Sequence, residues 1–510
     1  MNALRPLALV CLASALPAQD LELESTPTRW RLSYDEIGVP GGEDLGLLGV
    51  HYDLFAPDFD WGQFYAGLGG YGGLTGDAGG FFVGGLTGGW RRPLGADLSL
   101  DLGLFAGGGG GGGAPQGGGL MLRPHLALER SFGRLGLRAE LAHVEFPNGE
   151  LSDTVLSVGF TLDSALTTAR TARDPHVRRA DDSLSLDRVR MTAAAQVYRP
   201  TSESQKRISP DPYDDSLSLL GFQLAAELAP WLYLPLELWG AAGGDISGYA
   251  AVMSGLGFTG PLWGGALAWE LELLAGMGGG GDVDTGGGLQ LEAELGLRTR
   301  VAEHLALFAS IGRLDAPGGN FEATTVEFGL SWDPRVANLK QRRGRGRVSG
   351  EGFELDGWQL TVHDKIYFPA SEARKVDGSE YPGSLHLLGV GLEHALTDRV
   401  ALTGRAYGAY IGDIGGYAEG LFGAVARFRP LAGSDALLEF GYEIGVGGGG
   451  GMDVGPGLIH QATAGASWPL GSSARLSVEG GYVDAVSGGS FEGLVGSVGV
   501  RLGVGRALAL

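Results

Sequence analysis

Three aspartates stand in the same glycine-rich setting at a constant spacing. Asp77, Asp245 and Asp413 each follow a glycine and precede an aromatic residue by four positions, and the interval between successive members is identical (245 − 77 = 413 − 245). Because Ca²⁺ and Mg²⁺ prefer oxygen ligands, these aspartates are candidate metal ligands in external loops. Ordinary turn chemistry is the alternative, since aspartate and glycine both tolerate positive φ.

The histidines do not predict a catalytic or zinc centre. None of the nine falls in an HExxH spacing, and they do not recur at matching positions along the chain. His125 with Glu129 is the one pair that suggests a general base, and a solvated or ion-paired barrel lining is the favoured interpretation of it. We therefore predict that the protein is not an enzyme.

The composition excludes several classes of protein. Glycine contributes 94 of 510 residues, about 18 per cent, yet the glycines cluster and do not recur every third residue as collagen requires. A hydrophobic content of 44 per cent argues against disorder. The formal net charge of -22 argues against nucleic-acid binding, because phosphates require a basic surface.

The segment 1–18 reads as a secretory signal peptide. Arg5 precedes an apolar run at 7–15, and cleavage is expected after Ala18 or, alternatively, after Ala15. Either cut removes Cys11, the single cysteine, so the mature chain would have no disulfide. A lipid anchor on Cys11 is the other interpretation of this segment.

The chain is a threefold internal repeat. Besides the aspartate motifs, glycine runs recur in the same order at Gly107–Gly113, Gly278–Gly281 and Gly447–Gly451. Several motifs at nearly one period indicate repeated structural units.

Each repeat is expected to contain eight β-strands. Leu135, Leu137 and Leu141 alternate with Arg138 and Glu140, which is the periodicity of a strand with one apolar face. Similar alternation predicts strands of about the 9–11 residues that cross a membrane when tilted. In the first repeat they are expected at 30–37, 46–55, 61–71, 79–92, 97–106, 118–131, 134–146 and 154–163.

The tryptophans favour lipid over a protein core as the partner of the apolar face. Eight of the ten tryptophans fall at strand ends beside short turns, and only Trp239 and Trp269 lie elsewhere. Tryptophan gathers at membrane interfaces because its ring is apolar while its N–H seeks water. Short turns also alternate with longer Gly/Asp-rich loops, as in outer-membrane barrels.

On these patterns the chain resembles the small eight-stranded outer-membrane barrels of the OmpA and OmpX type, fused in tandem over roughly residues 29–505. The resemblance implies an all-β fold of transmembrane antiparallel up-and-down barrels, export to the bacterial outer membrane and insertion by its assembly machinery. Such barrels usually end on an aromatic residue, whereas this chain ends at Leu510. The expected organisation is a signal peptide at 1–18, barrel repeats at 29–163, 188–333 and 357–505, and polar basic linkers at 164–187 and 334–356.

Two closures of these strands are possible. Three separate barrels are favoured because both linkers are too long for ordinary turns, and a single 24-stranded barrel is the alternative. Narrow barrels would bury the inward side chains of Phe105, Met121, Leu274 and Phe308. Arg138 with Glu140, and Arg475 with Glu479, are predicted to form interior ion pairs.

The predicted function is that of a non-enzymatic integral outer-membrane protein with a structural or surface-interaction role. The alternative is a pore or transporter for small solutes formed by one 24-stranded barrel. Expected partners are outer-membrane lipids and lipopolysaccharide. Divalent ions at the loops would bridge to lipopolysaccharide phosphates, and the basic linkers would contact anionic lipid head groups. The alternative is that the linkers are plain soluble connectors.

Overall fold

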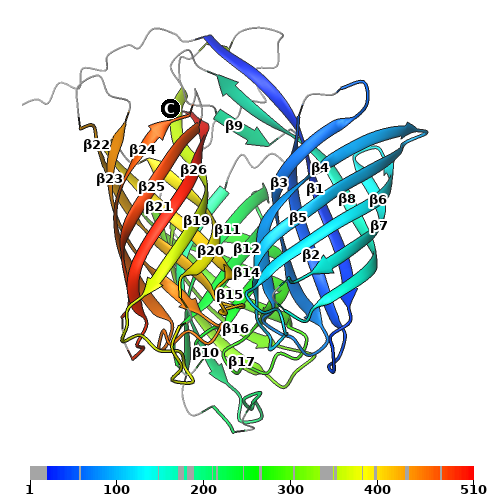
Figure 1. Ribbon diagram of the computed structural model, residues 1–510. Helices are drawn as coiled ribbons and strands as arrows, with labels where there is room; N and C mark the ends of the chain where they lie inside the picture. Colours follow the sequence, from blue (N-terminus) through cyan, green and yellow to red (C-terminus); the bar gives the residue numbers. More distant parts are fainter. Residues whose placement is uncertain are drawn as a thin grey trace, which may run out of the picture.

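The protein folds into three closed antiparallel β-barrels that stand side by side (Figure 1). The computed structural model describes residues 20–56, 59–147, 149–170, 177–180, 189–208, 211–213, 216–244, 246–263, 267–302, 305–332, 348–349, 353–381, 383–395, 399–430, 436–470, 474–486 and 488–509. The predicted signal peptide, Cys11 and Asp245 lie outside these residues. Within them, no helix is long and apolar enough to cross a membrane.

Barrel 1 comprises the first eight strands, in the order expected from the alternation. Each strand pairs with its neighbour in sequence, and β8 closes the barrel by pairing with β1, as in Tyr34 opposite Val158. The strands are β1 (Asp20–Ile37), β2 (Leu45–Phe55), β3 (Gln63–Thr75), β4 (Phe82–Gly95), β5 (Leu98–Gly110), β6 (Leu120–Phe132), β7 (Leu135–Glu145) and β8 (Ser152–Arg170).

Barrels 2 and 3 repeat this arrangement. In barrel 2, Gln196 of the first strand lies opposite Glu327 of the last, and in barrel 3 Thr361 lies opposite Arg501. Barrel 2 consists of β10 (Val189–Pro200), β11 (Leu217–Ala229), β12 (Leu232–Gly243), β13 (Ala250–Leu262), β14 (Leu267–Gly279), β15 (Leu289–Ala302), β16 (Leu305–Asp315) and β17 (Glu322–Trp332). Barrel 3 consists of β19 (Phe353–Pro369), β20 (Leu385–Ala395), β21 (Val400–Ile411), β22 (Ala418–Phe428), β23 (Leu437–Gly448), β24 (Leu458–Pro469), β25 (Ala474–Ala485) and β26 (Glu492–Ala509).

The alternative of one 24-stranded barrel is wrong, and the prediction of three eight-stranded barrels is confirmed. A single barrel would require β8 to pair with β10. Instead, β8 pairs with β1, along residues 22–34 of β1. An even number of strands returns the chain to the side on which it began, so each repeat can satisfy its own edge hydrogen bonds.

Two short strands join barrels 1 and 3 on the side where the chain enters and leaves each barrel, which we call the turn side. β9 (Val177–Ala180) extends β8 and meets β26 at Gly505, while β18 (Val348–Ser349) pairs with the start of β1. These strands lie in the segments expected to be linkers, and β8 itself continues to Arg170.

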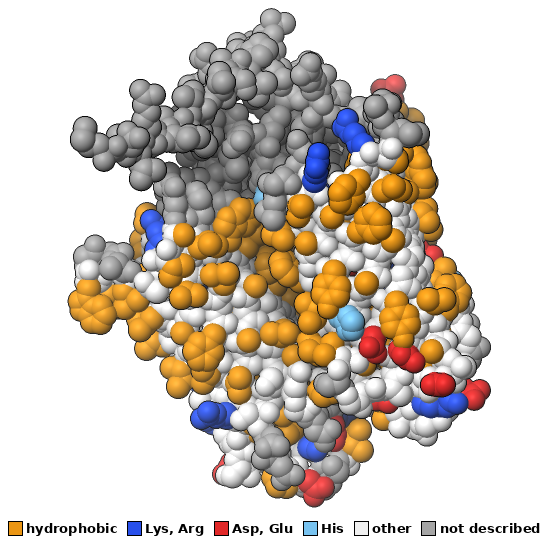
Figure 2. Space-filling view, turned by 90° about the vertical axis from the view of Figure 1, so that its left-hand side faces the viewer, with side chains coloured by type: hydrophobic (Ala, Val, Ile, Leu, Met, Phe, Trp, Pro, Cys, Tyr) orange, Lys and Arg blue, Asp and Glu red, His pale blue; other side chains and the backbone are white. Residues whose placement is uncertain are grey.

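The outer wall of each barrel is apolar and the inner wall is polar. On β7, Leu135, Leu137 and Leu141 are 46 to 61 per cent exposed, whereas Arg138 and Glu140 are almost fully buried. Figure 2 shows hydrophobic side chains spread over the wall, with many of the charged side chains toward its ends. This pattern suits a barrel whose outer face meets lipid.

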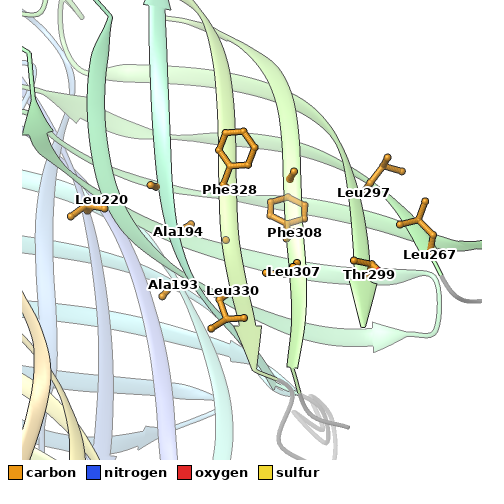
Figure 3. A pocket seen from close by; sticks show the side chains of 13 residues that line it. Ala193, Ala194, Leu220, Leu267, Leu297, Thr299, Leu307, Phe308, Phe328 and Leu330 are labelled. Atoms are coloured by element: carbon orange, nitrogen blue, oxygen red, sulfur yellow. The ribbon is translucent and has the colours of Figure 1, made fainter. Parts of the chain in front are cut away.

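The wall of barrel 2 also carries an apolar recess. Its volume is about 710 Å³, and its rim includes Leu220, Leu307, Phe328 and Leu330, which project outward from the strands (Figure 3). Small side chains such as Ala193 form part of its lining. The recess is part of the surface that we expect to face lipid.

The tryptophans predicted to mark one membrane interface lie at the turn side. Trp61, Trp231 and Trp263 are 50 to 83 per cent exposed beside the β2–β3 turn, the β11–β12 turn and the end of β13. Trp239, by contrast, is buried inside barrel 2. Exposed indole rings at one level are typical of the aromatic girdle of a membrane barrel.

The barrel interiors are filled by side chains. Phe105, Met121, Leu274 and Phe308 are each at most 4 per cent exposed, as expected for narrow barrels. Toward the loop side, opposite the turn side, each barrel holds an apolar cluster such as Tyr198 with residues of the loops of barrel 2.

Candidate functional site

The recurrent motifs of the three repeats meet where the barrels touch. Barrel 1 contacts barrel 2 through β3 with β14 and β15, barrel 2 contacts barrel 3 through β12 with β23 and β24, and barrel 3 contacts barrel 1 through β21 with β5 and β6. The contacts therefore run in a cycle. We call their loop-side end the outer junction.

Glycine is required at the outer junction by close approach of backbones. A Cβ on Gly80 would lie 2.4 Å from the backbone of Gly279 and Gly280 in the next barrel. The corresponding contacts are 2.7 Å from Gly248 to the backbone nitrogen of Gly449 and 2.8 Å from Gly416 to that of Gly111. All three glycines belong to the aspartate motifs, and all have φ between 86° and 92°.

Loops of all three barrels line a cavity at the outer junction. It has a volume of about 550 Å³ and is lined mainly by glycines of all three barrels, together with Gln116, Arg207, Ile208 and Asp282. The cavity wall is thus largely backbone, which only a glycine-rich sequence allows at this packing distance.

The two aspartates of the candidate metal set that the structure describes each pair with a cationic side chain. Arg207 of barrel 2 reaches across to barrel 1, where its Nη2 lies 3.1 Å from Asp77 Oδ1 and its Nη1 donates to the carbonyl of Gly112. In barrel 3, Lys375 Nζ lies 2.8 Å from Asp413 Oδ2. Both aspartates thereby fasten loops to one another.

Turn chemistry is also visible at these acids. Asp413 has φ 51° and Asp282 has φ 63°, and the Asp282 carboxylate accepts a hydrogen bond from the backbone N–H of Ile208. Among the described residues, no three histidine or acidic side chains form a group that would hold a metal ion. The Ca²⁺ or Mg²⁺ site at Asp77, Asp245 and Asp413 stays a prediction.

Repeated tyrosines hold the long loops of barrels 2 and 3 over the barrel ends. Tyr213 donates to the carbonyl of Asp282, and Tyr381 accepts from the backbone N–H of Asp453. Burial raises the pKa of Tyr381 to about 12. In the same loop, hydrogen bonds from Ser379 lower the pKa of the exposed Asp377 below its usual value.

The interior of barrel 1 is a balanced ion-pair network. Arg138 Nη2 lies 2.6 Å from Glu140 Oε2, which confirms the predicted pair. His125 Nε2 lies 3.0 Å from Asp101 Oδ1, whereas Glu129 pairs with Arg29 at 2.7 Å. His125 and Glu129, the pair considered as a general base, therefore contact different partners.

Barrel 3 has a similar network built from other strands. Arg405 contacts Glu393, Glu443 and Glu479, and Arg501 contacts Glu479 at 2.7 Å. The predicted partner of Glu479, Arg475, donates instead to Ser467. Lys365 Nζ completes the set at 2.6 Å from Glu419.

Barrel 2 departs from this balance. Its two buried arginines, Arg190 and Arg298, both bind Glu270, at 2.9 and 2.7 Å. Five further buried glutamates have no cationic partner among the described residues: Glu237, Glu272, Glu292, Glu294 and Glu327. The alternation of the second repeat places these glutamates on the inner face, but no motif or spacing marks them as a group.

Comparison with known proteins finds low similarity. No protein-family model matches the chain, and no curated protein matches it. The siderophore receptor PirA from Pseudomonas aeruginosa aligns over 96% of this chain and 81% of its own, with 11% identity and a TM-score of 0.27. OccK2 (OpdF) from the same organism aligns over 96% of this chain and 100% of its own, with 12% identity and a TM-score of 0.24.

At such identities and scores, the assignment rests on the hydrogen-bond ladders of the chain itself. Three closed ladders, apolar outer walls and polar interiors give this protein the construction of an outer-membrane β-barrel protein.

Proposed function

We propose that the protein is a non-enzymatic integral protein of the bacterial outer membrane, in which three fused narrow barrels present one continuous loop surface. The observation that carries this proposal is the combination of closed ladders and apolar outer walls with interiors filled by ion pairs. Closed ladders leave no edge hydrogen bonds unsatisfied in lipid.

The loop face supports a structural or surface-interaction role. Glycine contacts and the Arg207–Asp77 pair hold loops of different barrels together, so the loops form one surface and not three. Acidic loops offer ligands for divalent cations, which would link the surface to lipopolysaccharide phosphates. Lipopolysaccharide, other outer-membrane lipids and the assembly machinery are the proposed partners.

Cell fractionation tests the placement in the membrane. We expect the mature chain in the outer-membrane fraction, with migration in denaturing gels that changes on heating, because closed barrels unfold reluctantly. Recovery of a soluble monomer without detergent would overturn the proposal.

Transport through narrow conduits is the second candidate function, and planar-bilayer recording separates it from the first. Filled eight-stranded interiors predict small conductance steps or none. Large and stable steps would favour a transport function over a purely structural one.

A further inference from the structure

The interior of barrel 2 carries an unusual excess of negative charge. Among the described residues, the buried charged side chains of barrels 1 and 3 are four cations with five carboxylates each, whereas barrel 2 has two cations and six carboxylates. Buried charges are normally paired. We call the five glutamates without a cation, Glu237, Glu272, Glu292, Glu294 and Glu327, the carboxylate ring.

The ring is a built arrangement of neighbouring strands. Glu272 on β14 lies directly opposite Glu294 on β15. Gln196 Nε2 donates to Glu292 at 3.1 Å and to Glu294 at 2.9 Å. Gln223 Nε2 in the same way joins Glu237 and Glu272, at 2.8 and 3.1 Å. Two glutamines thus tie four of the five carboxyl groups together.

The shared donors also bring carboxyl groups of the ring close to one another. The oxygens of Glu292 and Glu294 that accept from Gln196, and the oxygens of Glu237 and Glu272 that accept from Gln223, are separated by no more than the sum of two hydrogen-bond lengths. Two ionised carboxylates at such a distance repel strongly in a buried site. A positive charge on or between them removes that repulsion.

Five acceptor atoms at the ring remain without a partner among the described residues. Gln196 Oε1, Gln223 Oε1, Glu292 Oε2 and both oxygens of Glu327 receive no hydrogen bond from the described residues, and these side chains are at most 3 per cent exposed. Unpaired buried acceptors are costly. These oxygens therefore point to a ligand that supplies positive charge.

Comparison with barrel 3 shows which cations barrel 2 lacks. Glu237 and Arg405 are separated by the same interval as the repeated aspartates (405 − 237 = 413 − 245), and so are the aromatic residues two positions later, Trp239 and Tyr407. In barrel 2, Gln196 of the first strand lies opposite Glu327 of the last; at the corresponding place in barrel 3, Lys365 lies opposite Ser497. Barrel 2 therefore has Glu237 where barrel 3 has Arg405, and Gln196 where barrel 3 has Lys365.

The ring is enclosed on both sides. Toward the loops lies the apolar cluster that includes Tyr198, Trp239 and Phe321, and toward the turns lies the Arg190–Glu270–Arg298 group. Compensating charge must therefore reside within barrel 2 itself.

We propose that the carboxylate ring of barrel 2 is a site for small exchangeable cations, which take the place of the fixed arginines and lysine of barrel 3. Protons and metal ions share the required chemistry. Protons fit the present geometry better, because two carboxyl groups held by one glutamine can share a proton, whereas no group of three acidic side chains in the described part of the chain would hold a metal.

The test uses the full chain in detergent micelles at neutral pH and combines two measurements. Infrared spectroscopy reports protonated carboxyl groups through their carbonyl stretch, and elemental analysis reports metal retained after exhaustive dialysis. Both are made on the parent and on the Glu272→Gln/Glu294→Gln double variant. Glu443→Gln is the matched control, because Glu443 occupies the corresponding strand of barrel 3 and contacts Arg405 at 3.3 Å. Heat-modifiable migration confirms that each variant is folded.

A protonated-carboxyl band that is reduced in the double variant and unchanged in the control identifies protons as the bound cations. Retained metal that the double variant loses identifies metal ions. The proposal is overturned if the parent shows neither band nor metal, or if the double variant folds and leaves both unchanged. Should the double variant not fold, the parent alone decides: the absence of both signals overturns the proposal. Because micelles suffice, failure here is separate from failure of the outer-membrane assignment.

Discussion

Barrels 2 and 3 share strand number, closure and repeat motifs, yet they solve the problem of a polar interior differently. Barrel 3 sets Arg405 and Arg501 among glutamates, so fixed charges neutralise one another. Barrel 2 gathers five glutamates that have no cationic partner among the described residues, and four of them bind Gln196 or Gln223. The fold of an eight-stranded barrel therefore requires a polar interior, but it accommodates different balances of charge within that interior.

The largest effect is expected from exchanging the residues that distinguish the two interiors. Arg405→Glu gives barrel 3 the side chain of barrel 2 and leaves Glu393, Glu443 and Glu479 without their shared partner. Breaking a buried ion pair costs about 3–5 kcal/mol, so we expect barrel 3 to unfold at much lower denaturant concentration. Tryptophan fluorescence during unfolding in micelles measures the shift.

The reciprocal change is the control for this exchange. Glu237→Arg places a guanidinium among the carboxylate ring, and we expect a stability equal to or above that of the parent. Equal destabilisation by both changes would contradict the comparison, because it would mean that steric fit and not charge separates the two interiors.

A smaller effect is expected where the barrels are alike, at the outer junction. Gly80→Ala places a methyl group 2.4 Å from the backbone of barrel 2, and overpacking of this kind costs about 1–3 kcal/mol. We expect a lower melting temperature and easier proteolysis of the segments between barrels. Differential scanning calorimetry and limited digestion measure these changes.

Gly113→Ala is the matched variant, since Gly113 also has positive φ but has no atom within 4 Å of an added Cβ. It reports the cost of the backbone conformation alone. If both variants lose equal stability, contact between barrels contributes nothing, and the junction is not a stabilising interface.

A still smaller effect is expected from the ion pair that crosses between barrels. Arg207→Gln removes the pair with Asp77, which is largely exposed, and exposed pairs contribute about 0.2–1 kcal/mol. Lys375→Gln removes the matching pair within barrel 3. We expect only the Arg207 variant to increase hydrogen exchange in loops of barrel 1. An equal increase in both variants would show that the Arg207–Asp77 pair does not specifically hold the loops of barrel 1.

The smallest effect on folding is expected from replacing Asp77, Asp245 and Asp413 together by asparagine. Asparagine keeps the turn preference and removes ligand charge, so calcium binding should weaken while thermal stability changes little. Isothermal titration in micelles measures the affinity. A parent that binds no calcium, or a variant that binds it equally well, leaves these residues as turn formers and loop fasteners.

Much of this fold could be predicted from the local pattern. Alternation along β7 placed Arg138 and Glu140 on the inner face, and because they are next-but-one neighbours on one strand their ion pair follows directly. Glu479 was harder, because its partners Arg405 and Arg501 come from other strands. Alternation indicates which face a side chain occupies, and it does not indicate which side chains meet across the lumen.

The strands, their number in each repeat, the apolar outer face and the glycine motifs could be predicted from the sequence, because they depend on period-two alternation and on local backbone freedom. The closure of each repeat on itself, the contact of Gly80 with Gly280 of another barrel and the reach of Arg207 to Asp77 are established by the three-dimensional structure. These features depend on residues that lie far apart in the chain. Their contact follows from barrel closure and from the packing of three barrels around one axis, which no local pattern encodes.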